Sequence, residues 1–255
     1  MAGLADMNQD MVETLETLHC LEQAICSRID KDSEELGEGP STKVVVAWGI
    51  LTKMLKETVA FKEMGIKPSL ARGLMAEIMF RYIVEGWVQS KGMPYIYLNN
   101  LLIPRADKGT TQLDGVFITP SFATVVECKS YKGKLNIVDG KISTRVQEAT
   151  PWKQNYGHIM SLKEVLGDSY NIYFHNIVYI FSEGVIAKYE PSPEEYLIVN
   201  KVSFSQLDYL ERNQNFANRL SQGDLNDIAG ILSKYKPSVE EEEEHIRFVN
   251  SLIRE

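Results

Sequence analysis

The sequence is poor in cysteine and has no long apolar run. Its three cysteines are Cys20, Cys26 and Cys128, and no two of them have C-x-x-C spacing. Such a pattern argues against both a disulfide framework and a zinc site, so we expect three reduced thiols. No apolar stretch approaches the roughly 18 residues that a membrane span requires. We therefore expect no membrane partner.

The N-terminus lacks the basic region and the apolar stretch that together mark a secretory signal. Acidic residues occur early instead, at Asp6 and Asp10. By default this pattern predicts a cytoplasmic location.

An excess of positive charge is also missing. The formal net charge is -8, so the chain lacks the overall basic character of proteins that hold nucleic acid mainly by electrostatics. Any role with nucleic acid must depend on a local site. One segment, residues 129–153, is locally basic. It has only two acidic residues, Asp139 and Glu148, and its basic residues are Lys129, Lys132, Lys134, Lys141, Arg145 and Lys153.

At 255 residues, the chain has room for one core domain with helical additions. Apolar residues at helical spacing predict helices over about 4–30, 41–65 and 68–91. Alternating and β-branched segments then predict three antiparallel strands at 95–104, 111–118 and 123–131, with a further hairpin turning at Asp139-Gly140. A helix after Pro151 and a strand over 171–182 follow. We predict a helical arm (1–66), an α/β core (67–185) and a mostly helical C-terminal extension (186–255), whose last helix begins with a Ser238/Glu241 capping box.

Charged residues lie inside the second and third strands of this core. A hairpin centred between Pro120 and Ser121 places Asp114 opposite Glu127 on one face, with Cβ atoms about 5 Å apart. Lys129 projects from the same face, two residues further along. Because paired carboxylates repel each other, a shared proton, a cationic side chain or a metal ion must compensate.

The compensating group that best fits these residues is a divalent cation. Lys129 alone leaves a surplus of negative charge, and carboxylate oxygens at this spacing suit Mg²⁺ or Mn²⁺. A Glu-x-Lys pair beside such a metal is what phosphodiester hydrolysis needs, since the lysine can orient or deprotonate the nucleophile. The plain alternative is an ion-pair ladder on a solvated face of the sheet.

The order of elements, with "LD" before "ECK", resembles the PD-(D/E)XK nuclease superfamily. The segments "GLMAEIMFRYIV", "TQLDGVFITPSFATVVECKSYKG" and "ATPWKQNYGHIMSLKEVLG" are similar to the nuclease-related domain called NERD. The positions that match its motifs are Gly73, Glu77, Gln112, Asp114, Glu127, Lys129, Tyr131, Gly133, Pro151, Gln154 and His158. Thr150 departs from the family pattern, which has Asn before the proline.

The resemblance implies an αβββαβ restriction-endonuclease-like α/β (α+β) core with a central mixed sheet, flanked by N- and C-terminal helical extensions. It also implies that Glu77 approaches the metal from the first core helix, and that Gln154 faces the substrate or an activated water. Exposed surface positions are the competing interpretation for both residues. His158 is expected to be structural, and His175-Asn176 resembles an HNH nuclease only superficially because a second metal histidine is absent.

We therefore expect a metal-dependent nuclease acting on DNA, with RNA left open. The predicted catalytic residues are Glu77, Asp114, Glu127, Lys129 and Gln154, of which Glu77, Asp114 and Glu127 hold Mg²⁺ or Mn²⁺. The predicted nucleic-acid contacts are Gln112, Lys132, Lys134, Lys141, Arg145 and Lys153. The acidic run Glu240–Glu244 is interpreted as a solvated helix face, with a mask over the basic segment as the alternative.

A different class of function also stays open. The acidic net charge and the many residues outside the resemblance fit a non-catalytic module that binds nucleic acid or protein on a nuclease-like fold. The helical arms would then serve a protein partner or a second copy of the chain. An intact Glu-x-Lys pair argues against this alternative, because a module freed of catalysis need not keep mutually repelling carboxylates.

Overall fold

A computed structural model describes residues 2–37, 39–56, 58–106, 109–131, 133–145, 147–170, 172–182, 185–190, 196–199, 204–212, 219–242 and 244–245. The helices are α1 (Ala2–Leu36), α2 (Pro40–Met54), α3 (Thr58–Glu63), α4 (Pro68–Lys91), α5 (Pro151–Leu166), α6 (Phe204–Arg212) and α7 (Gln222–Leu232), with short 3₁₀ turns η1 (Gly167–Ser169) and η2 (Ser233–Tyr235). The strands are β1 (Ile96–Pro104), β2 (Thr110–Ile118), β3 (Ala123–Lys129), β4 (Lys134–Val138), β5 (Lys141–Ser143), β6 (Glu148–Ala149), β7 (Phe174–Ile180), β8 (Val185–Glu190) and β9 (Tyr196–Val199).

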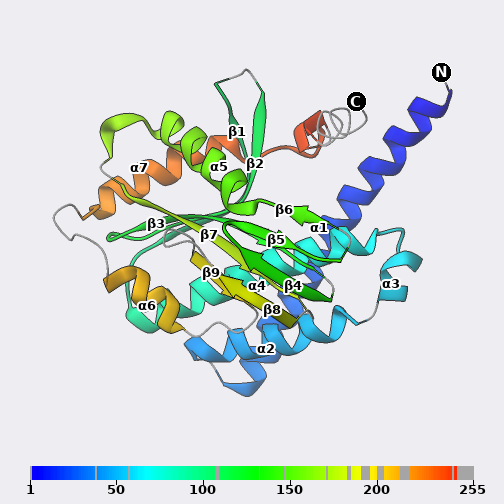
Figure 1. Ribbon diagram of the computed structural model, residues 1–255, viewed down its shortest axis with the longest axis horizontal. Helices are drawn as coiled ribbons and strands as arrows, with labels where there is room; N and C mark the ends of the chain where they lie inside the picture. Colours follow the sequence, from blue (N-terminus) through cyan, green and yellow to red (C-terminus); the bar gives the residue numbers. More distant parts are fainter. Residues whose placement is uncertain are drawn as a thin grey trace.

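The larger sheet of the described chain has the strand order β1-β2-β3-β7-β9 (Figure 1). Its first three strands form the predicted antiparallel meander, whereas β7 pairs in parallel with β3 and β9 in parallel with β7. The elements α4-β1-β2-β3-α5-β7 therefore follow the predicted αβββαβ order around a central mixed sheet. This result confirms the predicted fold class.

The register of the β2–β3 hairpin is the predicted one. Gly115 pairs with Val126 and Ile118 with Ala123, and the backbone N–H of Thr119 closes the turn on the carbonyl of Phe122 at 2.8 Å. Asp114 and Glu127 follow the Gly115–Val126 pair directly, at the end where the cleft described below opens. The hairpin thus brings the two carboxylates to the same edge of the structure.

Helices cover both faces of the larger sheet (Figure 1). On one face, Phe117 and Val126 belong to a core built with α1, α2, α4 and α6. On the other face, Val116 and Val125 pack with α5 and α7. Because side chains alternate along a strand, neighbouring residues of β2 and β3 enter different cores. The N-terminal helices share their core with the central sheet.

A smaller sheet, β6-β5-β4-β8, is inserted between β3 and α5 and closed by the later strand β8. Its β4–β5 hairpin turns at Asp139 (φ 47°) and Gly140 (φ 72°), as the dipeptide predicts. The prediction was incomplete here, because β6, β8 and β9 were not expected. It was also wrong about one continuous helix over 41–65, since a turn after Met54 separates α2 from α3.

Two further expectations concern single features. The three cysteines are free, as expected. The C-terminal capping box is present, because the Ser238 N–H donates to Glu241 Oε2 at 2.8 Å and the Glu241 N–H donates to Ser238 Oγ at 3.3 Å. Among the described residues, no helix combines the length and the apolar character needed to cross a membrane.

Because α2 packs closely on α4, replacing two glycines of α4 by alanine should change the free energy of unfolding in opposite directions. A Cβ at Gly86 would lie 2.6 Å from the carbonyl oxygen of Pro40 and 2.7 Å from Val44 Cγ2, whereas one at Gly73 would meet nothing within 4 Å. We expect Gly86→Ala to lower the free energy of unfolding by about 1–3 kcal/mol through overpacking. Gly73→Ala should raise it by about 0.5–1 kcal/mol, because alanine favours the helix. Urea unfolding measures both, and equal stability of the Gly86→Ala protein and its parent would contradict the packing.

Candidate active site

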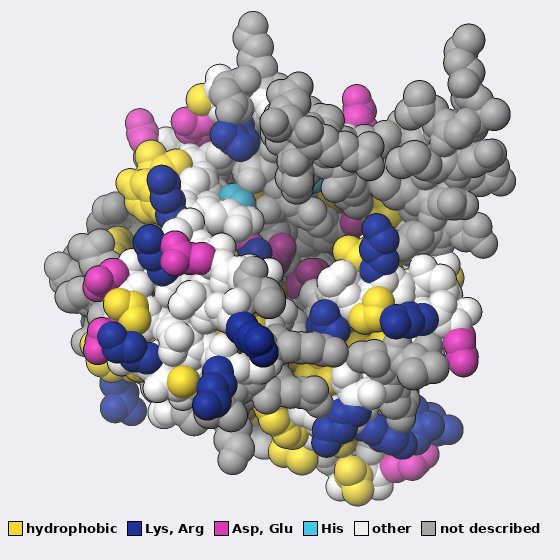
Figure 2. All heavy atoms as spheres, turned by 45° about the vertical axis from the view of Figure 1, so that its right-hand side comes forward, with side chains coloured by type: hydrophobic (Ala, Val, Ile, Leu, Met, Phe, Trp, Pro, Cys, Tyr) yellow, Lys and Arg dark blue, Asp and Glu magenta, His cyan; other side chains and the backbone are white. Residues whose placement is uncertain are grey.

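A cleft of about 1000 Å³ opens beside the end of the β2–β3 hairpin. Its walls come from α4, β2, β3, α5, the tip of the β1–β2 hairpin and the C-terminal segment. Figure 2 shows acidic side chains inside a hollow of the surface, with Lys and Arg side chains around it. The residues that line the cleft are Glu77, Arg105, Ala106, Thr110, Thr111, Gln112, Asp114, Glu127, Cys128, Lys129, Thr150, Lys153, Gln154, Gly157, His158, Met160, Ser161, Glu164 and His245.

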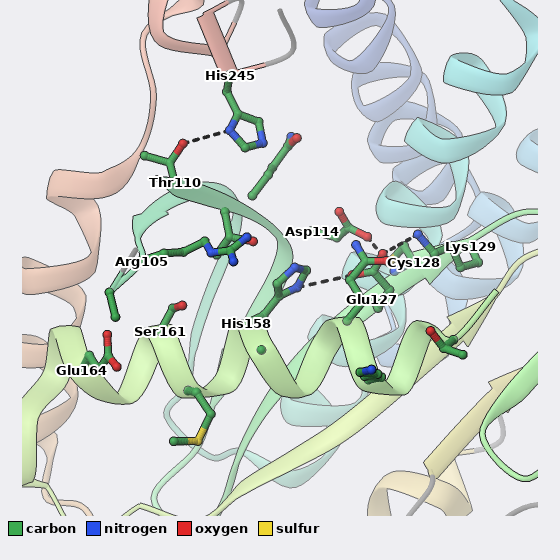
Figure 3. A pocket seen from close by; sticks show the side chains of 18 of the residues that line it. Arg105, Thr110, Asp114, Glu127, Cys128, Lys129, His158, Ser161, Glu164 and His245 are labelled. Atoms are coloured by element: carbon green, nitrogen blue, oxygen red, sulfur yellow. Dashed lines mark hydrogen bonds and ion pairs between the residues drawn. The ribbon is translucent and has the colours of Figure 1, made fainter. Parts of the chain in front are cut away.

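The Glu127–Lys129 pair lies on β3, between β2 and β7. Glu127 is 1% exposed, and its Oε1 lies 2.5 Å from Lys129 Nζ (Figure 3). A carboxylate so deeply buried is costly unless it is paired. The ion pair satisfies one oxygen, while Oε2 accepts no hydrogen bond from the described residues. The surface ion-pair ladder does not describe this site, because Glu127 is buried.

Asp114 approaches the same group from β2. Its Oδ2 accepts a hydrogen bond from the backbone N–H of Cys128 at 2.7 Å, which ties the carboxylate to β3. Cys128 itself is buried in the core on the α4 side, as expected of a structural thiol. Asp114 is only partly buried and lines the cleft.

Burial and mutual repulsion shift the ionisation of these carboxyl groups. Burial, together with the negative charge of Asp114, raises the pKa of Glu127 to about 8, although Lys129 and the amide of Gln154 lower it in part. Burial also raises the pKa of Asp114, against the opposing effects of Lys129 and the Cys128 N–H. Burial lowers the pKa of Lys129, but Glu127 outweighs that effect and the net shift is upward. The lysine is therefore positively charged at neutral pH.

Glu77 and the start of α5 complete the group. Glu77 is half-buried on α4 and lines the cleft, and its pKa is raised by burial and then by Asp114. Lys153 and Gln154 are exposed on the first turn of α5 and line the opposite wall. Asn155 fixes this helix over the sheet, because its Nδ2 donates to the carbonyls of Val125 at 2.7 Å and Ile177 at 3.1 Å. Asn155 was not among the residues predicted from the sequence.

His158 contacts the site from α5. Its Nδ1 lies 3.4 Å from Glu127 Oε2, and burial, together with the charges of Lys129 and Arg105, lowers the pKa of His158 to about 4. The imidazole is therefore neutral at physiological pH. His158 is buried beside Glu127, and its structural role stays a prediction.

The carboxylates of the cleft supply only some of the ligands that a hard divalent cation needs. Within the described ranges, no three His, Cys, Asp or Glu side chains form a group that could hold a metal ion. Mg²⁺, however, is usually bound by one or two carboxylates, with water and substrate phosphate filling the other positions. Asp114 and the unpartnered Oε2 of buried Glu127 supply such a pair. Burial raises the pKa of both carboxyl groups, and a bound cation would favour their ionised forms.

The predicted nucleic-acid contacts do not all reach the cleft. Gln112 and Lys153 line it, but Lys134 and Arg145 are exposed outside its lining. Lys141 forms an ion pair with Glu148 across β5 and β6, with Nζ and Oε1 3.0 Å apart. Lys132 lies outside the described residues. That all these residues contact nucleic acid stays a prediction, and of those that the structure describes only Gln112 and Lys153 line the cleft.

Arg105 and His245 are among the cleft residues that were not predicted from the sequence. Arg105 follows β1 at the hairpin tip, where its backbone N–H donates to the Gly109 carbonyl at 2.8 Å, and Figure 3 shows its side chain extending across the cleft. His245 reaches the cleft from the C-terminal segment and contacts Thr110 Oγ1 through Nδ1 at 2.9 Å. The basic turn "RADKGT" could have identified Arg105, whereas no local signal marks His245.

Comparison with known families agrees with this arrangement. Residues 72–181 match the model of NERD, the nuclease-related domain. No curated protein and no solved structure matches the chain. The matched range contains the acidic group, Lys129 and Gln154, whereas His245 lies outside it. Over residues 72–181, the chain is thus similar to the NERD family of nuclease-related domains.

Proposed function

We propose that the protein is a divalent-metal-dependent nuclease that hydrolyses phosphodiester bonds in DNA. One observation carries the proposal: the buried Glu127 carboxyl and the charged Lys129 lie 2.5 Å apart at the wall of a large cleft, next to Asp114. Paired carboxylates cost stability at such a position. A role in binding a cation explains why the chain keeps them.

The charge of Lys129 defines what this residue contributes. Because the pKa of Lys129 is raised, its ammonium group is a poor base and a good hydrogen-bond donor. We assign it to orienting the attacking water and to stabilising the negative charge that develops on the phosphate. Of the two roles considered for the lysine from the sequence, the first is therefore the better supported.

Asp114 and Glu127, with Glu77 near them, would hold Mg²⁺ or Mn²⁺. When bound, the ion supplies positive charge for the phosphate and lowers the pKa of a bound water. Gln154, whose amide lowers the pKa of Glu127, favours the ionised form of that carboxyl and lines the cleft. His158 excludes water from behind Glu127.

The test is a cleavage assay on linear, nicked and single-stranded DNA, with matched RNA, in Mg²⁺, Mn²⁺ or EDTA. We expect turnover that requires the metal and disappears in Glu127→Gln. Tight binding that is independent of metal, with no turnover on any substrate, would instead support the non-catalytic module. Cleavage that survives Glu127→Gln would show that the assigned site is wrong.

Two basic residues of the cleft should carry the backbone contacts. Arg105 and Lys153 line the cleft, whereas Lys141 is held by Glu148 outside it. Each phosphate contact releases about one condensed counterion. We therefore expect Arg105→Ala and Lys153→Ala each to weaken DNA binding and to lower its salt dependence by nearly one unit. Lys141→Ala is the matched control, and binding that depends on Lys141 but not on Arg105 or Lys153 would place the DNA elsewhere.

A further inference from the structure

The C-terminal segment places a buried carboxylate beside the cleft. After the capping box at Ser238, Glu242 is only 7% exposed. Its Oε2 accepts a hydrogen bond from Asn100 Nδ2 at 3.1 Å and lies 3.4 Å from His19 Nε2 of α1. The neighbouring acidic residues Glu240, Glu241 and Glu244 are exposed. Glu242 is thus not part of a uniformly solvated acidic face.

Asn100 links this carboxylate to the cleft. It lies within β1 but has φ 51°, a left-handed conformation that asparagine tolerates better than most residues. Gln112 Nε2 donates to Asn100 Oδ1 at 2.6 Å. A chain of two side-chain hydrogen bonds therefore runs from Glu242 through Asn100 to Gln112, which lines the cleft two residues before Asp114. Strained backbone held at such a junction is typical of functional sites.

The chemistry of Glu242, Asn100 and Gln112 determines which group donates and which accepts in each of these hydrogen bonds. An ionised carboxylate can only accept, so the Asn100 amide must turn its NH₂ group to Glu242 and its carbonyl oxygen to Gln112. Gln112 must then use an amide hydrogen toward Asn100. Its carbonyl oxygen and its second amide hydrogen are the parts of the amide that this hydrogen-bond chain does not engage. The carbonyl oxygen, whose direction the chain sets, can pair only with a donor such as a base N–H, because a phosphate offers no hydrogen.

We propose that Glu242 is a positioning residue for Gln112, and that Gln112 accepts a hydrogen bond from a base N–H group of the DNA. The inference rests on the proposed function for the identity of the substrate. Glu242 lies outside the NERD segment, so the C-terminal extension completes the cleft. Gln112 is then a contact to a base, where the sequence predicted only a nucleic-acid contact of unspecified kind.

The test measures DNA affinity in EDTA, so that no strand is cut, for Glu242→Ala, Gln112→Ala and the double variant. We expect each single change to weaken binding about fivefold, the size of one lost hydrogen bond. The double variant should be no weaker than Gln112→Ala, because both changes remove one interaction. The salt dependence of binding should stay at the parent value, because no phosphate contact is lost. Glu240→Ala, which removes the same charge from an exposed position, should bind like the parent.

A second readout separates positioning from a merely structural role. The side-chain amide signal of Gln112 in ¹H–¹⁵N spectra, assigned by its loss in Gln112→Ala, should shift in Glu242→Ala and in the size-matched Glu242→Gln. Glu242→Gln keeps the segment packed but no longer fixes the amide direction, so its affinity should fall between those of the parent and Glu242→Ala. These measurements remain decisive if Glu242→Ala unfolds.

Several outcomes would overturn the inference. Additive effects of the two single changes, an unmoved Gln112 signal, or a salt dependence that drops with Gln112→Ala would each do so. If the effects of Glu242→Ala and Gln112→Ala on DNA affinity are coupled but the protein cuts no DNA, this inference holds and the nuclease proposal fails. A parent that binds no DNA would overturn the inference outright.

Discussion

Replacing Lys129 by methionine is expected to reduce metal-dependent DNA cleavage by about 10²–10⁴-fold, the range seen when one electrostatic or proton-transfer group is removed from an active site. Methionine keeps most of the side-chain length but loses the ammonium group that lies 2.5 Å from Glu127. Without that charge, the pKa of Glu127 should rise further, because the largest remaining influences are burial and Asp114. With a pKa already about 8 in the parent, the Glu127 carboxyl would then ionise less readily when the metal binds. Single-turnover cleavage with saturating DNA measures the loss.

Lys134→Met is the matched control, because Lys134 is an exposed strand lysine outside the cleft lining. It should cleave DNA at the parent rate. Thermal unfolding of Lys129→Met checks that the chain still folds. A folded Lys129→Met protein with parental activity would remove Lys129 from the mechanism.

Replacing Asp114 by asparagine should abolish cleavage and stabilise the metal-free protein. Asparagine can still accept the Cys128 N–H through its carbonyl oxygen, so the hydrogen bond at 2.7 Å can survive. The negative charge that helps to raise the pKa of Glu127 is lost, and so is the repulsion between the two carboxylates. We expect a gain of about 1 kcal/mol in the free energy of unfolding in EDTA, as for relief of a like-charge pair across strands. Cleavage should fall by at least about 10²-fold, because one of two metal ligands is weakened.

Urea unfolding in EDTA and then in Mg²⁺ tests both parts of this prediction. In Mg²⁺ the ranking should reverse, since only the parent gains stability by binding the ion. Asp168→Asn, at an exposed aspartate, controls for the change in net charge. An Asp114→Asn protein that is less stable than the parent in EDTA would show that the carboxylate is needed for folding and not mainly for function.

The parts of the fold that local chemistry determines could be predicted from the sequence. The turn around Pro120 and the two-residue period of its strands fixed which residues share a face, and Gly115 pairs with Val126 accordingly. Strands β8 and β9 were missed because they are short and become strands by pairing in parallel with β4 and β7, which are distant in sequence. Only the folded arrangement supplies those partners.

The residues of the candidate site likewise fall into those that the local sequence predicts and those that only the folded structure brings together. Asp114, Glu127 and Lys129 lie on one hairpin, so spacing along two strands was enough to bring them together. Arg105 and His245 reach the cleft only because the β1–β2 tip and the C-terminal segment return to it in space. The pairing of Lys141 with Glu148 could not be anticipated, because it depends on β6, a strand of two residues with no recognisable pattern.

The placement of β3 inside the larger sheet has a consequence for how the protein can meet a bulky polymer. β3 is hydrogen-bonded to β2 on one side and to β7 on the other, so displacing it requires the breaking of two ladders. The described C-terminal wall is held by side-chain contacts such as Thr110 with His245 and Asn100 with Glu242, without a strand ladder. Amide hydrogen exchange should therefore be slowest along β3 and much faster at this wall. The cleft can thus adjust to the width of its ligand while Glu127 and Lys129 keep their spacing.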